Sequence, residues 1–285
     1  MILSRKFYVI SISIFIILMA VLAIGDLDFT ISEAIINENS LWARFFDIFG
    51  EIPAYGGVIL AITLLYGGRN RTIKWWNIVS STITIVFLST SSFFMTLGIT
   101  RYIFHEEMDT ITTFAYIIMI IMTLLIIVTA LYIAHTKGHK FVGFQKHAWL
   151  LILLVLFEGV IVNIIKSLWA RPRMRSINDV SEFKHWYEIN GWTNDNELKS
   201  FPSGHTSNGF VIIAYMMFVP YFKSIKMNYF IIGAVIWGTL VALSRVVLGA
   251  HFLSDVLVGS YITIFLFLLF EKVMLQKSKG EISNG

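Results

Sequence analysis

The chain has no cysteine and little charge, and both shortages narrow the class of protein. Without cysteine, the 285 residues can build neither a disulfide scaffold nor a site with thiolate nucleophiles or cysteine-bound metal. Charged residues make up only 14% of the chain and apolar residues 56%, whereas soluble domains average about 25% and about 45–50%. A disordered chain needs the opposite balance. The composition therefore predicts a single integral membrane domain of several helices.

Long apolar runs mark the helices expected to cross the membrane, because one span needs about 20 apolar residues. The run at 7–25 is long for the apolar stretch of a signal peptide, so we expect a retained helix. Two runs, at 52–66 and 206–221, are shorter than the others. We expect an all-α, polytopic transmembrane helical bundle of about eight spans, in which the six clear runs are 7–25, 77–97, 111–134, 147–165, 229–243 and 252–270.

The distribution of charge orients this bundle. With eight spans both termini lie on one side, and the segments on that side contain 13 of the 22 lysines and arginines but only two of the 18 acidic residues. An excess of basic residues marks the cytoplasmic side of a membrane protein. We therefore expect a multi-pass protein of the cell membrane with both termini in the cytoplasm.

Three polar clusters lie on the other, extracytoplasmic side, close to the ends of spans. They are residues 166–173 (KSLWARPR), 201–206 (FPSGHT) and 244–255 (SRVVLGAHFLSD). In the second cluster, Pro202 and Ser203 suit the first turn and the N-cap of a helix. A helix N-terminus offers free backbone N–H groups and partial positive charge to an anion. Gly204 would let an oxyanion approach the backbone closely, with His205 beside it.

The third cluster supplies a second histidine with an acidic partner. His251 and Asp255 are four residues apart and would share one face of a helix. A carboxylate on one ring nitrogen fixes the tautomer and leaves the other nitrogen nucleophilic. If Lys166, Arg173 and Arg245 converge on one anion beside this pair, the group suits phosphoryl transfer through a phosphohistidine. Two histidines and an aspartate could also bind zinc, but the nearby cations would repel a metal ion, so we expect no metal.

In their order and spacing, the three clusters resemble the signature of the type 2 phosphatidic acid phosphatase (PAP2) superfamily. The family pattern is Lys-x6-Arg-Pro, then Pro-Ser-Gly-His, then Ser-Arg-x5-His-x3-Asp. The second motif is complete at 202–205 and the third at 244–255, whereas Met174 stands where the first motif ends in proline. The resemblance covers roughly residues 150–270.

This resemblance implies a metal-independent phosphatase that needs no cofactor. By analogy, His251 attacks phosphorus, Asp255 orients His251, and His205 protonates the leaving oxygen. The residues implied to hold the phosphate are Lys166, Arg173, Ser203, Gly204 and Arg245. The family usually has six spans, so we expect a six-helix phosphatase-like core plus two extra N-terminal spans. The expected division is N-terminal transmembrane helices at 1–146, the motif-bearing core at 147–275 and a cytoplasmic tail at 276–285.

The implied substrate is a membrane lipid phosphate, whose phosphomonoester or diphosphate headgroup is hydrolysed at the outer leaflet. Phosphatidic acid, phosphatidylglycerol phosphate and polyprenyl diphosphate all fit, and no nucleic acid is involved. Two alternatives remain open. One is a lipid phosphotransferase that uses the same site, and the other is a lipid transporter with a vestigial phosphate site.

Three further features lie outside the motif pattern. We expect Arg171 to form an ion pair or to contact a headgroup rather than to act in catalysis. Glu158 lies in the middle of a span, where a carboxylate is usually paired or functional, and we expect it to bond to a neighbouring helix such as the Ser/Thr-rich stretch 80–92. The loop 174–201 is rich in aromatic residues, so we expect it to be partly buried and to shape substrate entry.

Overall fold

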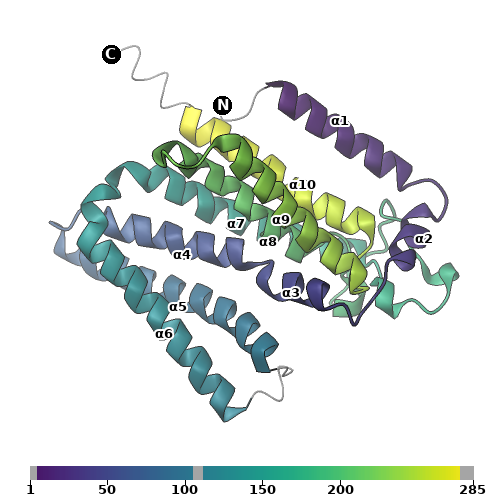
Figure 1. Ribbon diagram of the computed structural model, residues 1–285, viewed down its shortest axis with the longest axis horizontal. Helices are drawn as coiled ribbons and strands as arrows, with labels where there is room; N and C mark the ends of the chain where they lie inside the picture. Colours follow the sequence, from purple (N-terminus) through teal and green to yellow (C-terminus); the bar gives the residue numbers. More distant parts are fainter. Residues whose placement is uncertain (1–4, 105–111, 277–285) are drawn as a thin grey trace.

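The computed structural model describes residues 5–104 and 112–276, and within these ranges all regular secondary structure is helical. The long helices lie alongside one another as a bundle (Figure 1). The α-helices in the described ranges are α1 Arg5–Val21, α2 Leu27–Ala34, α3 Leu41–Phe49, α4 Ile52–Gly67, α5 Lys74–Phe104, α6 Thr113–Lys137, α7 Gln145–Trp169, α8 Gly204–Phe210, α9 Met227–Val247 and α10 Leu253–Phe270. Other helical segments are η1 Gly138–Lys140, η2 Val142–Phe144, η3 Met174–Ser176, η4 Val180–Glu182, η5 Asn196–Leu198, η6 Val211–Tyr221 and η7 Glu271–Gln276.

Six stretches of the described chain are long and apolar enough to cross a membrane, as a multi-pass membrane protein requires. They are Leu41–Gly67, Lys74–Arg101, Thr113–Lys140, Val142–Ser176, Met227–Val247 and Leu253–Leu275. The other two expected spans are helical but shorter. The expected span at 7–25 corresponds to the apolar helix Val9–Val21, and the expected span at 206–221 divides between α8 and η6. The expected count of eight is therefore not confirmed. Residue 111 and the tail from 277 onward lie outside the described residues.

The centre of the bundle is formed where α4, α7, α9 and α10 pack around η6. Its fully buried side chains include Leu150 and Leu154 of α7, Val211 and Met216 of η6, and Phe267 of α10. Lipid is as apolar as these side chains, so close packing rather than exclusion of water holds membrane helices together. The motif-bearing helices are thus part of one tightly packed group.

Two edges of the bundle flank this centre. At one edge α1 packs on α10, where the rings of Phe15 and Tyr261 lie 4.5 Å apart and the Tyr261 hydroxyl donates to the Ser11 carbonyl at 2.9 Å. At the opposite edge α5 and α6 pack on each other and on α4 (Figure 1). In Figure 1, α5 and α6 therefore lie on the side of the bundle away from α1 and α10.

The ends of α8, α9 and α10 position the polar clusters. Ser203 is the N-cap of α8 and accepts a hydrogen bond from the Thr206 N–H at 3.4 Å, as expected, whereas Pro202 precedes the cap and so lies outside the first turn where it was expected. Between α9 and α10, Gly249 has a φ of 64°, a left-handed conformation that favours glycine. Gly259 of α10 lies against the Ser203 backbone, where any Cβ would overlap the Ser203 carbonyl oxygen. This close approach holds the second motif against the third.

Candidate active site

The three motif segments meet at one end of the bundle, although they lie far apart in the sequence. The Ser203 N–H donates to the Asp255 carbonyl at 3.0 Å, and the Ser200 N–H donates to the Arg171 carbonyl at 3.0 Å. The Arg173 guanidinium donates to the Ala250 carbonyl at 3.4 Å. Two of these bonds join backbone to backbone and one comes from a side chain, and together they bring the first motif, the chain around the second motif and the third motif into one site.

His251 is buried at the centre of this site, with its Nδ1 atom facing Asp255. The distance from Nδ1 to the Asp255 carboxylate is 3.5 Å, and the Ser200 hydroxyl lies at the same distance from Nδ1. Asp255 is held in turn by the Ser200 hydroxyl at 2.5 Å and the Phe252 N–H at 3.0 Å. The expectation that the pair shares a helix face was wrong, because His251 precedes the N-cap of α10. The capping turn, rather than helical spacing, brings the two side chains together.

The surroundings of His251 favour its neutral form. Burial lowers the pKa of His251 well below the ordinary histidine value. The hydrogen bond to Asp255 raises this pKa, while the charges of Lys166 and Arg245 lower it further. The imidazole therefore keeps an unprotonated ring nitrogen at neutral pH, as a nucleophile requires.

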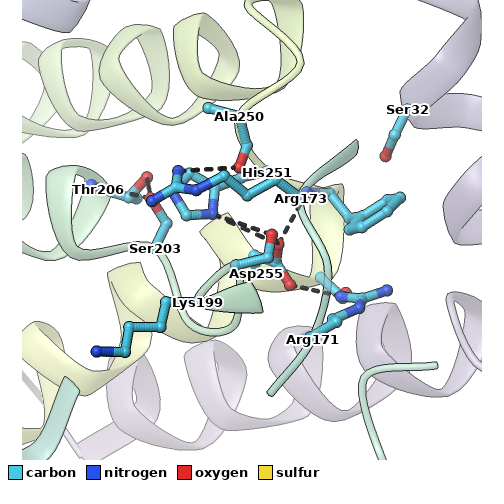
Figure 2. A network of polar contacts seen from close by, with 12 residues as sticks. Ser32, Arg171, Arg173, Lys199, Ser203, Thr206, Ala250, His251 and Asp255 are labelled. Atoms are coloured by element: carbon cyan, nitrogen blue, oxygen red, sulfur yellow. Dashed lines mark hydrogen bonds and ion pairs between the residues drawn. The ribbon is translucent and has the colours of Figure 1, made fainter. Parts of the chain in front are cut away.

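Arg171 forms the fully buried base of the site. Its guanidinium pairs with Asp255 at 2.5 Å and with Asp28 of α2 at 2.9 Å, and it also donates to Ser254 and to the Lys184 carbonyl, each at 2.7 Å. Figure 2 shows Asp255 between His251 and Arg171. The ion pair expected for Arg171 is confirmed. Sequence reasoning missed Asp28, because nothing local distinguishes it from the acidic residues near it in the sequence.

The expected phosphate-binding cations surround His251 in different ways. Lys166 donates to the Lys199 carbonyl at 2.8 Å, and Arg173 donates through Nε to the Asn196 carbonyl at 3.0 Å. Arg173 lies beside His251 in Figure 2, with Ser203 on the side away from Arg171. A Cβ on Gly204 would lie 3.7 Å from the Lys166 side chain, so the first and second motifs are in contact.

Arg245 is buried and incompletely bonded. Its side chain is 8% exposed, and one terminal nitrogen contacts the Asp47 carboxylate of α3. Its Nε atom is buried and, among the described residues, has no hydrogen-bond partner. A buried guanidinium nitrogen without a partner is costly unless a ligand supplies an acceptor. Arg245 therefore has a donor available for an anion.

His205 faces two carboxylates that sequence reasoning missed. Its Nε2 atom lies 3.6 Å from Asp47, and its Nδ1 atom lies 3.7 Å from Glu51, which precedes α4. His205 is 36% exposed, in contrast to His251 at 2%. The signal that could have found these carboxylates is their spacing of four residues at the end of an otherwise apolar stretch. Within residues 5–104 and 112–276, no three His, Asp or Glu side chains are grouped as metal ligands would be.

Glu158 and the loop 174–201 complete the surroundings of the site. The Glu158 carboxylate accepts hydrogen bonds from Ser207 of α8 and, at 2.9 Å, from Thr263 of α10. Pairing with a neighbouring helix is confirmed, but the suggested stretch 80–92 was wrong, because this face of α7 packs on α8 and α10. In the loop, Met174 and Phe183 are buried against Phe29 and Phe252. The loop is therefore partly buried, as expected, and Met174 fills a packing position.

The comparisons with known proteins agree with the motif pattern. Residues 147–279 match the family model of the PAP2 superfamily, which confirms the resemblance over that segment. The chain is 33% identical over 136 residues to phosphatidylglycerophosphatase B of Bacillus subtilis (strain 168), covering 44% of this chain and 59% of that protein. It is 29% identical over 110 residues to lipid A 1-phosphatases of Rhizobium johnstonii and Rhizobium etli, covering 38% of this chain and 40% and 42% of those proteins. The chain thus spans about three fifths of the first relative and two fifths of the others. No solved structure is significantly similar to it.

Proposed function

We propose that this protein is an integral membrane phosphatase that removes phosphate from a lipid through a phosphohistidine on His251. One observation carries the proposal: the Nδ1 atom of a buried, neutral histidine faces Asp255 while three basic residues lie around it. The names of the relatives, which are phosphatases of phosphatidylglycerophosphate and of lipid A, support a phosphorylated lipid as substrate. The apolar helices that surround the site support a substrate already in the membrane.

Substrate binding depends on electrostatic complementarity. Lys166, Arg173 and Arg245 offer positive charge to the phosphate oxygens, and Arg245 also has the buried Nε donor without a partner in the described chain. Ser203 and the backbone of Gly204 lie at the start of α8, which favours negative charge. These groups stabilise the equatorial oxygens as phosphorus passes through its transition state.

In the first chemical step, the His251 Nε2 lone pair attacks phosphorus while Asp255 holds the proton on Nδ1. The P–N bond forms as the bond from phosphorus to the lipid oxygen breaks. His205 gives its proton to that leaving oxygen, which departs as the lipid alcohol. Asp255 also stabilises the positive charge on the phosphorylated ring.

In the second step, water completes the reaction. Neutral His205 takes a proton from the water as its oxygen attacks phosphorus, and the P–N bond breaks. The electron pair returns to His251 Nε2, and inorganic phosphate leaves. No redox change occurs, and the chain's own groups carry all the proton transfers. We propose that no metal takes part, and that the site opens on the extracytoplasmic face.

The test is phosphate release from purified protein with phosphatidic acid, phosphatidylglycerol phosphate and polyprenyl diphosphate, with EDTA present. We expect release that vanadate inhibits and that His251→Asn abolishes. The matched control is His139→Asn, an exposed histidine of η1 at the other end of the bundle, which should keep full activity. Release that survives His251→Asn would contradict the proposal. A phosphorylated acceptor without free phosphate would instead indicate a phosphotransferase, and lipid translocation without hydrolysis a transporter.

A further inference from the structure

Two acidic residues from the N-terminal half reach the site from outside the segment that matches the family model. Asp47 lies near the end of α3, and Glu51 lies between α3 and α4. Their carboxylates lie on the two ring nitrogens of His205, at 3.6 Å from Nε2 and 3.7 Å from Nδ1. Both N–H groups of a protonated His205 would therefore face a carboxylate.

The two carboxylates are held differently. Glu51 is anchored, because it accepts a hydrogen bond from Asn208 at 2.7 Å and from the Tyr55 hydroxyl at 3.3 Å. Asn208 is three residues after His205, so α8 presents both side chains on one face. Asp47 has no such anchor in the described contacts and instead touches Arg245. Hydrogen bonds therefore fix the position of Glu51, whereas Asp47 forms an ion pair with Arg245, a cation of the proposed phosphate site.

The carboxylates beside His205 have charged or titratable neighbours of their own. Glu51 interacts electrostatically with Tyr55 of α4 and with Lys166 and Glu158 of α7. Asp47 of α3 contacts Arg245 of α9. The two carboxylates therefore lie between His205 and the cations Lys166 and Arg245.

We propose that Asp47 and Glu51 are positioning residues, which orient the His205 ring for proton transfer to the leaving oxygen. The proton on Nε2 is the one transferred, while the Nδ1 side of the ring faces Glu51. Asp47 also contacts Arg245, so it links the His205 ring to a cation of the proposed phosphate site. This inference rests on the proposed function, because it assigns the support of the acid in the same reaction.

The first test compares leaving groups. An alkyl phosphate needs a proton on its leaving oxygen, whereas a nitrophenyl phosphate with the same lipid tail leaves readily without one. A general acid contributes about 10²–10⁴-fold to rate, so loss of its support in Asp47→Asn or Glu51→Gln should lower kcat/KM on the alkyl phosphate by about 10–100-fold. On the nitrophenyl phosphate we expect kcat/KM, which reports the first chemical step, to change by less than about threefold. His205→Gln should show the same division between substrates.

The second test uses the conservative variants Asp47→Glu and Glu51→Asp, which keep a carboxylate beside the ring. Each retains a charged acceptor for a ring N–H of His205, whereas Asp47→Asn and Glu51→Gln replace it with a neutral amide. Both conservative variants should therefore recover most of the kcat/KM that the amide variants lose on the alkyl phosphate. The matched control is Glu33→Gln, an exposed carboxylate of α2, which should behave as wild type.

The outcomes separate this inference from the proposed function. If His251→Asn abolishes turnover but Asp47→Asn and Glu51→Gln behave like Glu33→Gln, only the inference fails. Equal losses on both substrates without recovery in Asp47→Glu or Glu51→Asp would also overturn it, because they indicate a structural role. If His251→Asn remains active, the proposed function fails first. Should Asp47→Asn not fold, as judged by size-exclusion chromatography, Glu51→Gln alone decides the result.

Discussion

Asp28 and Asp47 both come from the N-terminal half, and each meets an arginine of the motif-bearing half in a different way. Asp28 is fully buried, and its oxygens accept from Arg171 at 2.9 Å, from the Ser254 hydroxyl at 2.5 Å and from the Ser254 N–H at 3.0 Å. Asp47 is 32% exposed and shares its oxygen between Arg245 and the more distant His205. The first carboxylate has its hydrogen bonds satisfied by the protein, whereas the second leaves room for exchange.

The two arginines differ in the same sense. Every nitrogen of the Arg171 guanidinium donates to a protein oxygen, so Arg171 has little to offer a substrate. Arg245 has a buried Nε without a partner in the described chain. A complete hydrogen-bond network stabilises one geometry, while an incomplete one can bind a ligand. The comparison teaches that buried charge supports Asp255 at Arg171, whereas at Arg245 it leaves a donor that we propose contacts phosphate.

The largest effect should come from breaking the complete network. Arg171→Met leaves Asp28 and Asp255 buried without their cation, which typically costs about 3–5 kcal/mol. We expect a large fall in the thermal unfolding temperature in detergent, or loss of folded protein. The control is Arg175→Met, because Arg175 pairs with Glu197 where both side chains are about half exposed. Unfolding of Arg171→Met close to wild type would contradict the structural role.

The next effect should come from the incomplete network. Arg245→Lys keeps the charge but loses the fork of donors that can contact both Asp47 and a phosphate oxygen. We expect kcat/KM to fall by about 10²-fold, as for loss of one transition-state donor, while the unfolding temperature changes much less than in Arg171→Met. Steady-state kinetics and thermal unfolding of the same preparation measure both. A variant that unfolds as readily as Arg171→Met would remove the distinction between the arginines.

A smaller effect concerns the acidic limb of the pH profile of kcat/KM. His251 must be neutral to attack, and its pKa is lowered well below the ordinary histidine value, chiefly by burial. Activity should therefore persist as the pH falls below about 6.5, where an ordinary histidine becomes protonated. On the acidic side, kcat/KM should begin to fall only when the pH approaches the lowered pKa of His251. A limb at or above the ordinary histidine value would contradict the burial argument.

The smallest effect should come from a surface ion pair. Glu197 accepts from Arg175 at 2.6 Å and from Ser176 at 2.7 Å, and these bonds lower its pKa to about 2. A lowered carboxyl pKa stabilises the fold above the unfolded value of about 4.3, and this contribution is lost as the pH falls toward the folded value. Because Glu197 is about half exposed, Glu197→Gln should lower stability by no more than about 1 kcal/mol at neutral pH. The difference from wild type should vanish near pH 2, as thermal unfolding at several pH values would reveal.

Much of the fold was predictable because membrane spans and helix caps are local properties. Apolar runs located most of the long helices, and Ser203 located the start of α8. The count of spans was less predictable, since α8 and η6 divide one run and α3 joins α4 in another. Length and apolar character predict that a segment is helical, but its packing partners decide how the helix ends.

The candidate site was predictable only in part, for a related reason. The motif residues could be named because their spacing within each segment is short and regular. Asp28 is 143 residues from Arg171, and Glu51 is 157 residues from Asn208, so no local pattern connects them. Glu158 could be predicted to have a partner, because a buried carboxylate requires one. Which partner it has depends on the face that α7 presents to α8 and α10.

By itself, the sequence determined the membrane class, the approximate positions of the helices and the identity of the motif side chains, because hydropathy, capping and short spacings act over a few residues. Only the tertiary structure decided which carboxylate meets which cation. Those contacts join helices that are distant in sequence, and they depend on how closely the helices approach, as at Gly259 and Ser203. The division between Arg171, which is fully bonded, and Arg245, which keeps a free donor in the described chain, follows from that packing.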